Sequence, residues 1–223
     1  MSGSAGRPEL AGLQVADAPE LWVALGFTVT DGHAVVGRVV VQLGVPGRGI
    51  TGWTLRHIAD GVALDGLPTE VTAAPPCAPG PCHPNGAIAI DQVVIATPDF
   101  DRTAAALDAA NMPLRRVQPD DAGAARSGEA GRRASGGPAA GGFRQGFRRL
   151  GPAILELVEA REGPPGPARF WGLVVIVADL ARLRDHLSPL VGEIRDAVQP
   201  ERHIAALSRD AGLSVRVAFM DPE

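Results

Sequence analysis

The chain has 223 residues, of which 45% are hydrophobic and 21% are charged. These proportions are close to those of globular proteins, so the chain can bury a core in one large domain or in two small ones. Its formal net charge of −4 gives no general attraction to nucleic acid or to an anionic membrane surface, and we expect neither of these partners.

The sequence contains no pattern typical of membrane insertion or export. Its longest uninterrupted apolar runs are far shorter than the roughly 18–20 residues that a membrane-spanning helix needs. The N-terminus, MSGSAGRPELAGLQVADAPE, carries acidic residues and lacks the apolar segment of a secretory signal. Only two cysteines occur, and a reduced pair fits the cytosol. We therefore expect a soluble cytoplasmic protein.

Residues 1–73 are expected to form an N-terminal segment of one helix followed by three strands. Asp17 is placed to cap a short helix over 20–25. The stretch GFTVTDGHAVVG is typical of a β-hairpin, with Asp31 and Gly32 at its turn. The stretches VVVQLG and ITGWTLRHI are rich in β-branched and aromatic residues, which favours strands there.

Residues 74–86 are expected to form a linker, because prolines and glycines are concentrated there. Cys77, Cys82 and His83 lie within it and are candidate metal ligands. A zinc site needs a fourth ligand and usually a closer spacing, and the fold would have to bring His57 near to supply one. We favour the interpretation that the thiols are incidental features of a loop.

Two stretches after this linker share one pattern, in which an apolar strand leads into a helix that begins at aspartate and three short strands follow. The first, over 87–160, opens with IDQVVIATPDFDRTAAAL, where Asp99 or Asp101 caps the helix, and it ends with ILELVEA. The second, over 168–221, opens with WGLVVIVADLARL, where Asp179 begins the helix, and it ends with SVRVAFM. A duplicated unit of this kind buries a shared interface and leaves a cleft between its copies.

These stretches resemble the vicinal oxygen chelate superfamily, also called the glyoxalase/bleomycin-resistance/dioxygenase fold. The resemblance implies an α+β fold in which repeated βαβββ modules over 87–221 form a curved, cleft-forming sheet. The segment 1–73 is similar to the same unit without its first strand, a partial αβββ module. If another chain supplied that strand, the protein would be a homodimer. A low-complexity spacer over 120–142 interrupts the first module, and the sequence does not determine whether it closes over a ligand.

In metal-using members of this family, one ligand lies early in the first strand of a module and is often His, and another is a Glu in the last strand. The resemblance places Gln92 and Glu156 at these positions. In the second module the early position falls near Trp171 or Gly172, and SVRVAFM has no carboxylate. Glu156 is thus expected to be a catalytic base or a metal ligand, and Gln92 a ligand or an orienting group. This incomplete set of ligands permits one divalent metal (Zn, Ni, Mn or Fe), but it favours a protein that binds no metal.

Other side chains are candidates for contacting a small molecule. Trp171 is placed near the cleft in the family pattern and can stack on a flat ligand. Arg148, between Arg144 and Arg149 in the chain, offers a fork for a carboxylate or phosphate, although a solvated sheet edge explains this cluster and is favoured. His203 can titrate near neutral pH, and an exposed turn explains it equally well.

Two functions of different classes follow from these residues. The first is a glyoxalase-like protein that acts on a small molecule in the cleft, as a metal-assisted lyase, isomerase or dioxygenase. The second is a metal-free module that binds an aromatic or anionic compound, as drug-binding members of the superfamily do. The retained Glu156 favours the first, and the lost ligand positions favour the second. A scaffold without any small-molecule site is the third alternative.

Overall fold

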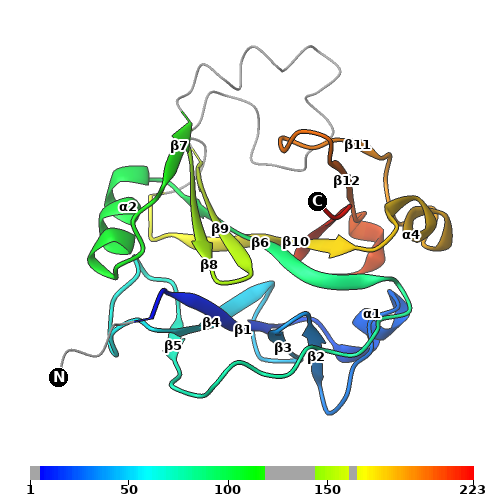
Figure 1. The fold of residues 1–223 in the computed structure, drawn as a ribbon, viewed down its shortest axis with the longest axis horizontal. Helices are drawn as coiled ribbons and strands as arrows, with labels where there is room; N and C mark the ends of the chain where they lie inside the picture. The colour runs from blue at the N-terminus through cyan, green and yellow to red at the C-terminus, as the bar shows by residue number, and fades with distance from the viewer. Residues whose placement is uncertain (1–5, 119–143, 161–164) are drawn as a thin grey trace.

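The computed structural model describes residues 6–118, 144–160 and 165–223, so the spacer expected over 120–142 lies outside the described residues. Two β-sheets lie against each other in this structure (Figure 1). The N-terminal sheet contains strands β1 (Glu9–Val15), β2 (His33–Val36), β3 (Val39–Leu43), β4 (Ile50–Arg56) and β5 (Thr69–Val71), with helix α1 (Pro19–Ala24) after β1.

The larger sheet contains two βαβββ modules. The first consists of β6 (Ala87–Thr97), α2 (Phe100–Ala109), β7 (Arg116–Gln118), β8 (Gln145–Leu150) and β9 (Ala153–Glu159). The second consists of β10 (Arg169–Val177), α4 (Leu180–His186), β11 (Arg195–Asp196), β12 (His203–Ala206), the 3-10 helix η2 (Arg209–Ala211) and β13 (Arg216–Met220). In each module the first strand pairs in parallel with the last, and the modules join through the antiparallel pair β6–β10. The expected α+β fold of repeated βαβββ modules is confirmed.

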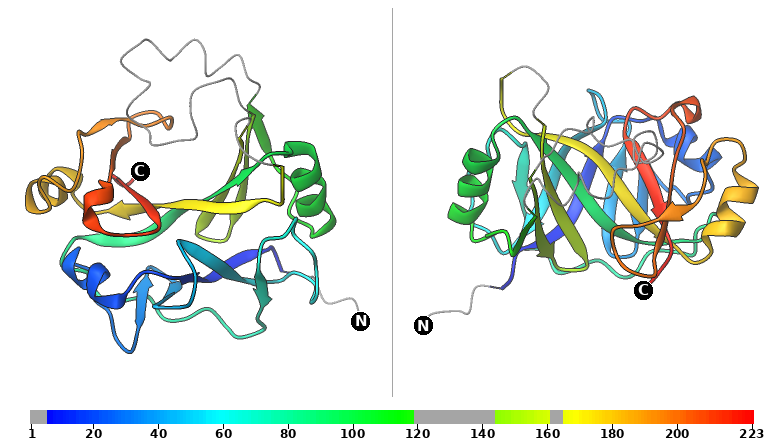
Figure 2. Two further views of the ribbon diagram at one scale, coloured as in Figure 1. Left: turned by 180° about the vertical axis from the view of Figure 1, so that it is seen from behind. Right: turned by 90° about the horizontal axis from the view of Figure 1, so that it is seen from above.

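The larger sheet curves, and its concave side faces away from the N-terminal sheet (Figure 2). The buried contacts identify the side that meets the N-terminal sheet. Phe170 of β10 packs edge-to-face against Trp53 of β4, with ring centroids 5.3 Å apart. Ile95 of β6 is the cross-strand partner of Phe170 and of Leu157 on β9, so all three side chains point to this side. The hydrophobic core therefore lies between the two sheets.

The N-terminal segment is not the partial αβββ module expected from the sequence, because β1 supplies its first strand. Leu10, Leu13 and Val15 of this strand are buried in the core. Strand β1 pairs in parallel with β3 and antiparallel with β4, and β5 pairs in parallel with β4. The larger sheet has the same arrangement at its centre, where β6 pairs in parallel with β9 and antiparallel with β10, and β10 pairs in parallel with β13. The ground for expecting a homodimer, a first strand lent by another chain, is thereby removed.

Asp17 joins the two sheets instead of capping α1. Its carboxylate accepts hydrogen bonds from the backbone amides of Ser214 and Val215, which immediately precede β13. The N-cap residue of α1 is Ala18, and no side chain forms a capping hydrogen bond there. The expected cap is therefore wrong, and Asp17 holds the loop before β13 against the N-terminal sheet.

A second connection between the sheets lies just before β10, at the same end of the parallel β10–β13 pair as the first. The carboxylate of Asp65, in the loop between β4 and β5, accepts two hydrogen bonds from the guanidinium group of Arg102 on α2, at 2.7 and 3.0 Å. The backbone carbonyl of Asp65 also accepts a hydrogen bond from the amide of Ala168 at 3.0 Å. The N-terminal sheet is thus tied to both modules of the larger sheet.

Residues 74–86 contain no helix or strand, and they lie along the N-terminal sheet. His83 is buried there: its Nδ1 accepts a hydrogen bond from the amide of Thr28 at 2.9 Å, and its Nε2 donates one to the carbonyl of Val35 at 3.1 Å. Burial lowers the pKa of His83, so the ring is neutral at pH 7. Because both ring nitrogens are used within the fold, His83 does not form a zinc site with Cys77 and Cys82.

The two helices that follow β6 and β10 begin where the sequence predicted. The Asp99 side chain accepts a hydrogen bond from the amide of Arg102 at the start of α2, and Asp179 does the same for Arg182 in α4. Of the two candidate caps for α2, the structure selects Asp99 over Asp101. Across the described ranges, no helix is both long enough and apolar enough to cross a membrane.

Candidate functional site

Strand register places the candidate site on the concave side of the larger sheet. Cross-strand partners point to the same side of a sheet. Glu156 pairs with Val94, Val94 with Gly172, and Gly172 with Arg216, so the four residues form one row across β9, β6, β10 and β13. Their side faces away from the N-terminal sheet, and we call it the concave face. The neighbouring row on this face consists of Ile154, Gln92, Val174 and Ala218.

Glu156 is the ionisable group at the centre of β9. Its neighbours Leu155 and Leu157 are fully buried in the core, and strand alternation directs Glu156 to the concave face. Burial, together with the charge of Asp91, raises the pKa of Glu156 to about 7. The carboxyl group forms no hydrogen bond with the described residues. At neutral pH it therefore exists in both protonation states and can donate or accept a proton.

Asp91 reaches the same face because a β-bulge interrupts β6. The register shifts between Gln92 and Ile90, and Asp91 is the inserted residue. Its Oδ1 lies 3.3 Å from Nη1 of Arg202, and both side chains are buried. Its Oδ2 is buried without a hydrogen-bond partner in the described structure. Asp91 therefore brings a buried negative charge close to Glu156, and sequence analysis did not identify it as a site residue.

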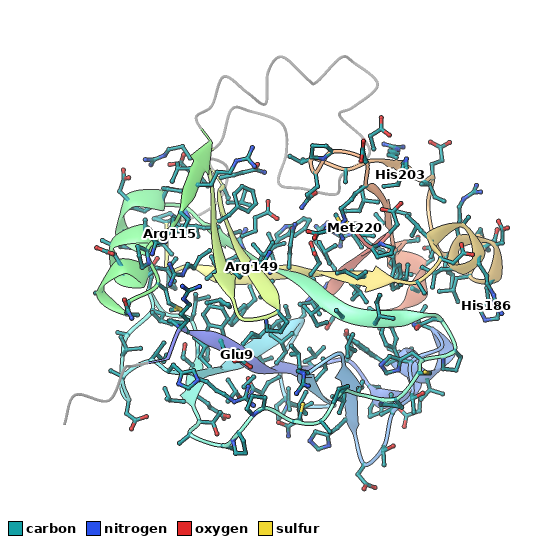
Figure 3. All side chains as sticks on the ribbon, viewed as in Figure 1. Glu9, Arg115, Arg149, His186, His203 and Met220 are labelled. Carbon is teal, nitrogen blue, oxygen red and sulfur yellow. The ribbon has the colours of Figure 1, made fainter. Side chains whose placement is uncertain are left out.

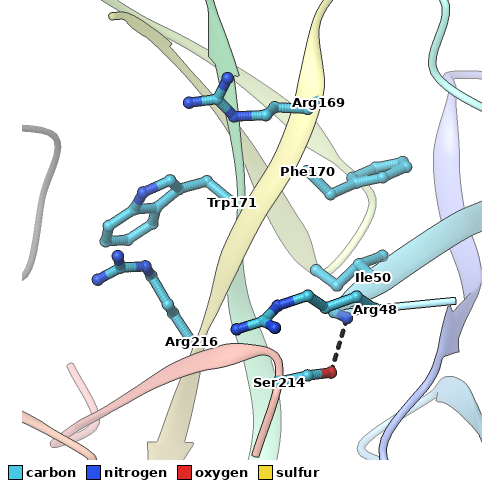
Figure 4. Close-up of a pocket in the computed structure, with 8 residues that line it drawn as sticks. Arg48, Ile50, Arg169, Phe170, Trp171, Ser214 and Arg216 are labelled. Atoms are coloured by element: carbon cyan, nitrogen blue, oxygen red, sulfur yellow. Dashed lines mark hydrogen bonds between the residues drawn. The ribbon is translucent and has the colours of Figure 1, made fainter. Parts of the chain in front are cut away.

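The concave face also carries two other side chains expected from the sequence. Gln92 is 5% exposed, and its amide forms no hydrogen bond with the described part of the chain. Trp171 lies at a bulge in β10 next to Gly172, and the Arg216 guanidinium stacks 4.8 Å from the centre of its ring. Figure 4 shows Trp171 and Arg216 on the side of β10 opposite Phe170. The structure thus brings Glu156, Gln92 and Trp171 to one face and adds Arg216.

Arg148 does not lie on the concave face. It pairs with Leu155 of β9, so its side chain points to the opposite side of the sheet, where its guanidinium group approaches the carbonyl of Pro113 at 3.4 Å. Burial and the charge of Arg115 lower the pKa of Arg148. Its neighbour Arg149 pairs with Ile154 and does point to the concave face.

His203 is also directed away from Glu156. Its ring Nδ1 lies 2.8 Å from Oδ2 of Asp221, and its backbone amide donates to Oδ1 of the same carboxylate. The next residue, Ile204, pairs with Met220 and faces the concave side instead. In Figure 3, His203 and Arg149 lie over different modules of the sheet. His203 therefore belongs to a surface contact at the end of β13.

The arrangement of strands can be compared with known proteins. No family model and no curated protein matches the sequence. A variant of 4-hydroxymandelate synthase from Streptomyces coelicolor is 14% identical, with a TM-score of 0.55 over 96% of this chain and 92% of its own. Methylmalonyl-CoA epimerase from Mycobacterium tuberculosis is 17% identical, with a TM-score of 0.44 over 62% of this chain and 90% of its own.

The synthase match extends over 96% of this chain and therefore includes both sheets of the structure. The chain has the vicinal oxygen chelate fold. A variant of the Streptomyces coelicolor epimerase, in complex with 2-nitronate-propionyl-CoA, is also similar: it is 16% identical, with a TM-score of 0.43 over 60% of this chain and 94% of its own.

The vicinal oxygen chelate fold relates four positions on the concave face by its internal repeat. When the aspartates that cap α2 and α4 are matched, Gln92 in the first module corresponds to Gly172 in the second. Glu156 corresponds to Ala218, because each pairs with the residue two positions after Gln92 or Gly172 on its own first strand. A metal site shared by the modules would be built from these four positions.

The residues at these positions do not fit a divalent metal. Gly172 and Ala218 have no side-chain donor atom, and a Cβ added at Gly172 would lie 2.7 Å from the carbonyl oxygen of Arg216. The remaining pair, the Glu156 carboxyl and the neutral Gln92 amide, falls short of the three or four ligands that such metals usually take. Among the residues that the structure describes, no three His, Cys, Asp or Glu side chains gather as a metal site. The metal-ligand roles expected for Glu156 and Gln92 are therefore not supported.

Proposed function

We propose that this vicinal oxygen chelate protein binds a small organic molecule on the concave face without a metal. The proposal is carried by the residues at the four repeat-related positions. Gly172 and Ala218 have no side-chain donor atom for a metal, whereas Glu156 and Gln92 each have one. Both remaining groups are polar, turned to one face and without hydrogen-bond partners in the described chain. Neither group is used for hydrogen bonding within the described chain, so both are available to hydrogen-bond a ligand on this face.

The row from Glu156 to Arg216 indicates the kind of ligand. Between its ends lie Val94 and Gly172, which present an apolar surface with little side-chain bulk. Three strand spacings separate the ends, roughly 14 Å between their Cα atoms. A matching ligand has an apolar or aromatic body, a hydrogen-bonding group beside Glu156 and a negative charge toward Arg216. Trp171, beside Gly172, offers a ring for stacking.

A second function, catalysis of proton transfer, is supported by the pKa of Glu156. A general base works best when its pKa lies near the operating pH, and burial raises the pKa of this carboxyl to about 7. Glu156 would take a proton from a carbon next to the ligand's carbonyl group, and the Gln92 amide would donate a hydrogen bond to that carbonyl oxygen. This chemistry uses residues of the concave face alone.

Both functions are tested with one set of compounds and one substitution. Ligand-observed NMR would measure binding of aryl carboxylates, 2-oxo acids and the 2-hydroxy acid 4-hydroxymandelate in buffer containing EDTA. We expect saturable binding by the wild type, at least tenfold weaker binding by Glu156→Gln and no change in Glu20→Gln, a matched control on the exposed surface of α1. Binding that requires an added metal, or that survives in Glu156→Gln, would contradict the proposal. In D2O the same spectra report exchange at carbon, which Glu156→Gln should abolish if Glu156 is the base.

A further inference from the structure

We propose a binding site for an oxyanion at the seam between the two sheets, which shares Trp171 and Arg216 with the concave face. A cavity of about 330 Å³ opens there, and three arginines, Arg48, Arg169 and Arg216, line it together with Trp171 and Ser214 (Figure 4). Arg48 comes from the loop between β3 and β4, whereas Arg169 and Arg216 begin β10 and β13. Three separate segments therefore contribute one positive charge each.

The charge of this cavity favours an anion. Among the residues that the structure describes, no acidic side chain lines it. Arg48 and Arg169 form no ion pair or hydrogen bond within the described residues. Burial, and after it the charge of Arg209, lowers the pKa of Arg216. A bound anion would accept charge-assisted hydrogen bonds from the guanidinium groups that line the cavity.

The backbone around the cavity is held in place by contacts that cross the seam. The amide of Gly49 donates a hydrogen bond to Oγ of Ser214 at 2.7 Å, which joins the loop carrying Arg48 to the loop before β13. Gly49 has a φ of 65°, a conformation that favours glycine. On the other side, the Trp171 ring supports the guanidinium group of Arg216 at 4.8 Å. The positions from which the three arginines project are thus fixed by the fold.

Guanidinium groups bind carboxylate and phosphate through paired N–H donors, and a cavity of about 330 Å³ has room for such a group. We infer that the occupant is a phosphate or carboxylate group, free or at the end of a small molecule. Arg48 and Ser214 lie outside the concave face, and Glu156 takes no part. Because Trp171 and Arg216 also belong to the concave face, Arg48 and Arg169 are the residues that distinguish this site from the ligand site proposed there.

Calorimetric titration with inorganic phosphate, methyl phosphate and succinate, at constant ionic strength, tests this site. We expect saturable binding of at least one of them, weakened at least tenfold in Arg48→Gln and in Arg169→Gln. The control Arg184→Gln removes an exposed arginine from α4, far from the cavity lining, and should bind as the wild type does. Binding without saturation, or equal weakening in Arg184→Gln, would mean general charge attraction and overturn the proposal.

A second measurement does not depend on any substitution. In 15N-labelled wild-type protein, phosphate or succinate should shift the indole N–H signal of Trp171, which lines the cavity, and leave that of buried Trp22 unchanged. The absence of a Trp171 shift at saturating anion would place the binding elsewhere. Glu156→Gln should keep this response, which separates the oxyanion site from the concave-face proposal.

Discussion

Glu156 is a carboxyl group in a place where its ionisation is unfavourable. The folded protein keeps a proton on it up to about pH 7, whereas the unfolded chain loses that proton near its ordinary pKa of 4.5. Between these two values the folded state binds more protons, so this residue makes the free energy of unfolding fall as the pH rises. The loss amounts to at most about 3 kcal/mol above pH 7. His83, whose pKa is lowered, acts with the opposite sign and lowers stability as the pH falls below its unfolded value near 6.5.

Glu156→Gln should therefore stabilise the protein in a pH-dependent manner. The neutral amide resembles the protonated carboxyl, so the variant and the wild type should unfold at similar urea concentrations at pH 5. At pH 8 the variant should be more stable by about 2–3 kcal/mol, because only the wild type has to bury an anion. Contributions from His83 are common to both proteins and cancel in the difference. A stability difference that stays constant between pH 5 and pH 8 would refute this origin of the raised pKa.

At the level of elements, Asp17 shows how one carboxylate connects a loop of the second module to the N-terminal sheet. Asp17→Ala would leave the amides of Ser214 and Val215 without their acceptor in a largely buried position. We expect a loss of about 2–4 kcal/mol in the free energy of urea unfolding, because hydrogen bonds to a charged group are lost and buried donors remain unpaired. Asp60→Ala, at an exposed loop position, should change stability by less than about 0.5 kcal/mol. Equal effects of both substitutions would show that the connection contributes nothing to stability.

The features predicted correctly from the sequence are those set by local interactions. Asp99 and Asp179 cap their helices through bonds to residues three positions away. Strand β1 was missed because its pairing partners, β3 and β4, lie more than 20 residues further along the chain. Its sequence, ELAGLQV, contains a single β-branched residue and a central glycine, so it shows no distinctive strand pattern by itself.

In the candidate site, too, local patterns predicted some features, and only the pairing of distant strands established the others. Leucines on both sides of Glu156 predict its orientation, because alternation along one strand is visible in the sequence. The strand containing Arg148 and Arg149 shows little alternation, and a shift of one residue exchanges the two faces. Only the pairing with β9 establishes that Arg149 is the residue on the concave face. Asp91 was missed because it reaches this face through a β-bulge, which no local pattern indicated.

The whole molecule consists of two curved sheets that share one core, and this arrangement leaves the concave face free of the N-terminal sheet. The side of the larger sheet that carries Ile95, Leu157 and Phe170 is covered by the N-terminal sheet. Each of these side chains contributes about 1.5–3 kcal/mol when it is buried. The pair of modules over 87–221 therefore depends on residues 6–73 for its stability, although it contains the complete βαβββ repeat.

A fragment covering 84–223 should consequently fail to fold on its own. Its apolar side, no longer covered, should bind the dye ANS strongly, and its urea unfolding should be broad, whereas the complete chain should unfold in one transition that circular dichroism and tryptophan fluorescence follow together. Adding a separate fragment that covers 6–83 should restore the sharp transition, because β1 to β5 bring back the surface that packs against Phe170. A cooperative transition of the 84–223 fragment alone, without ANS binding, would mean that the larger sheet is an independent domain and that the N-terminal sheet is an addition to it.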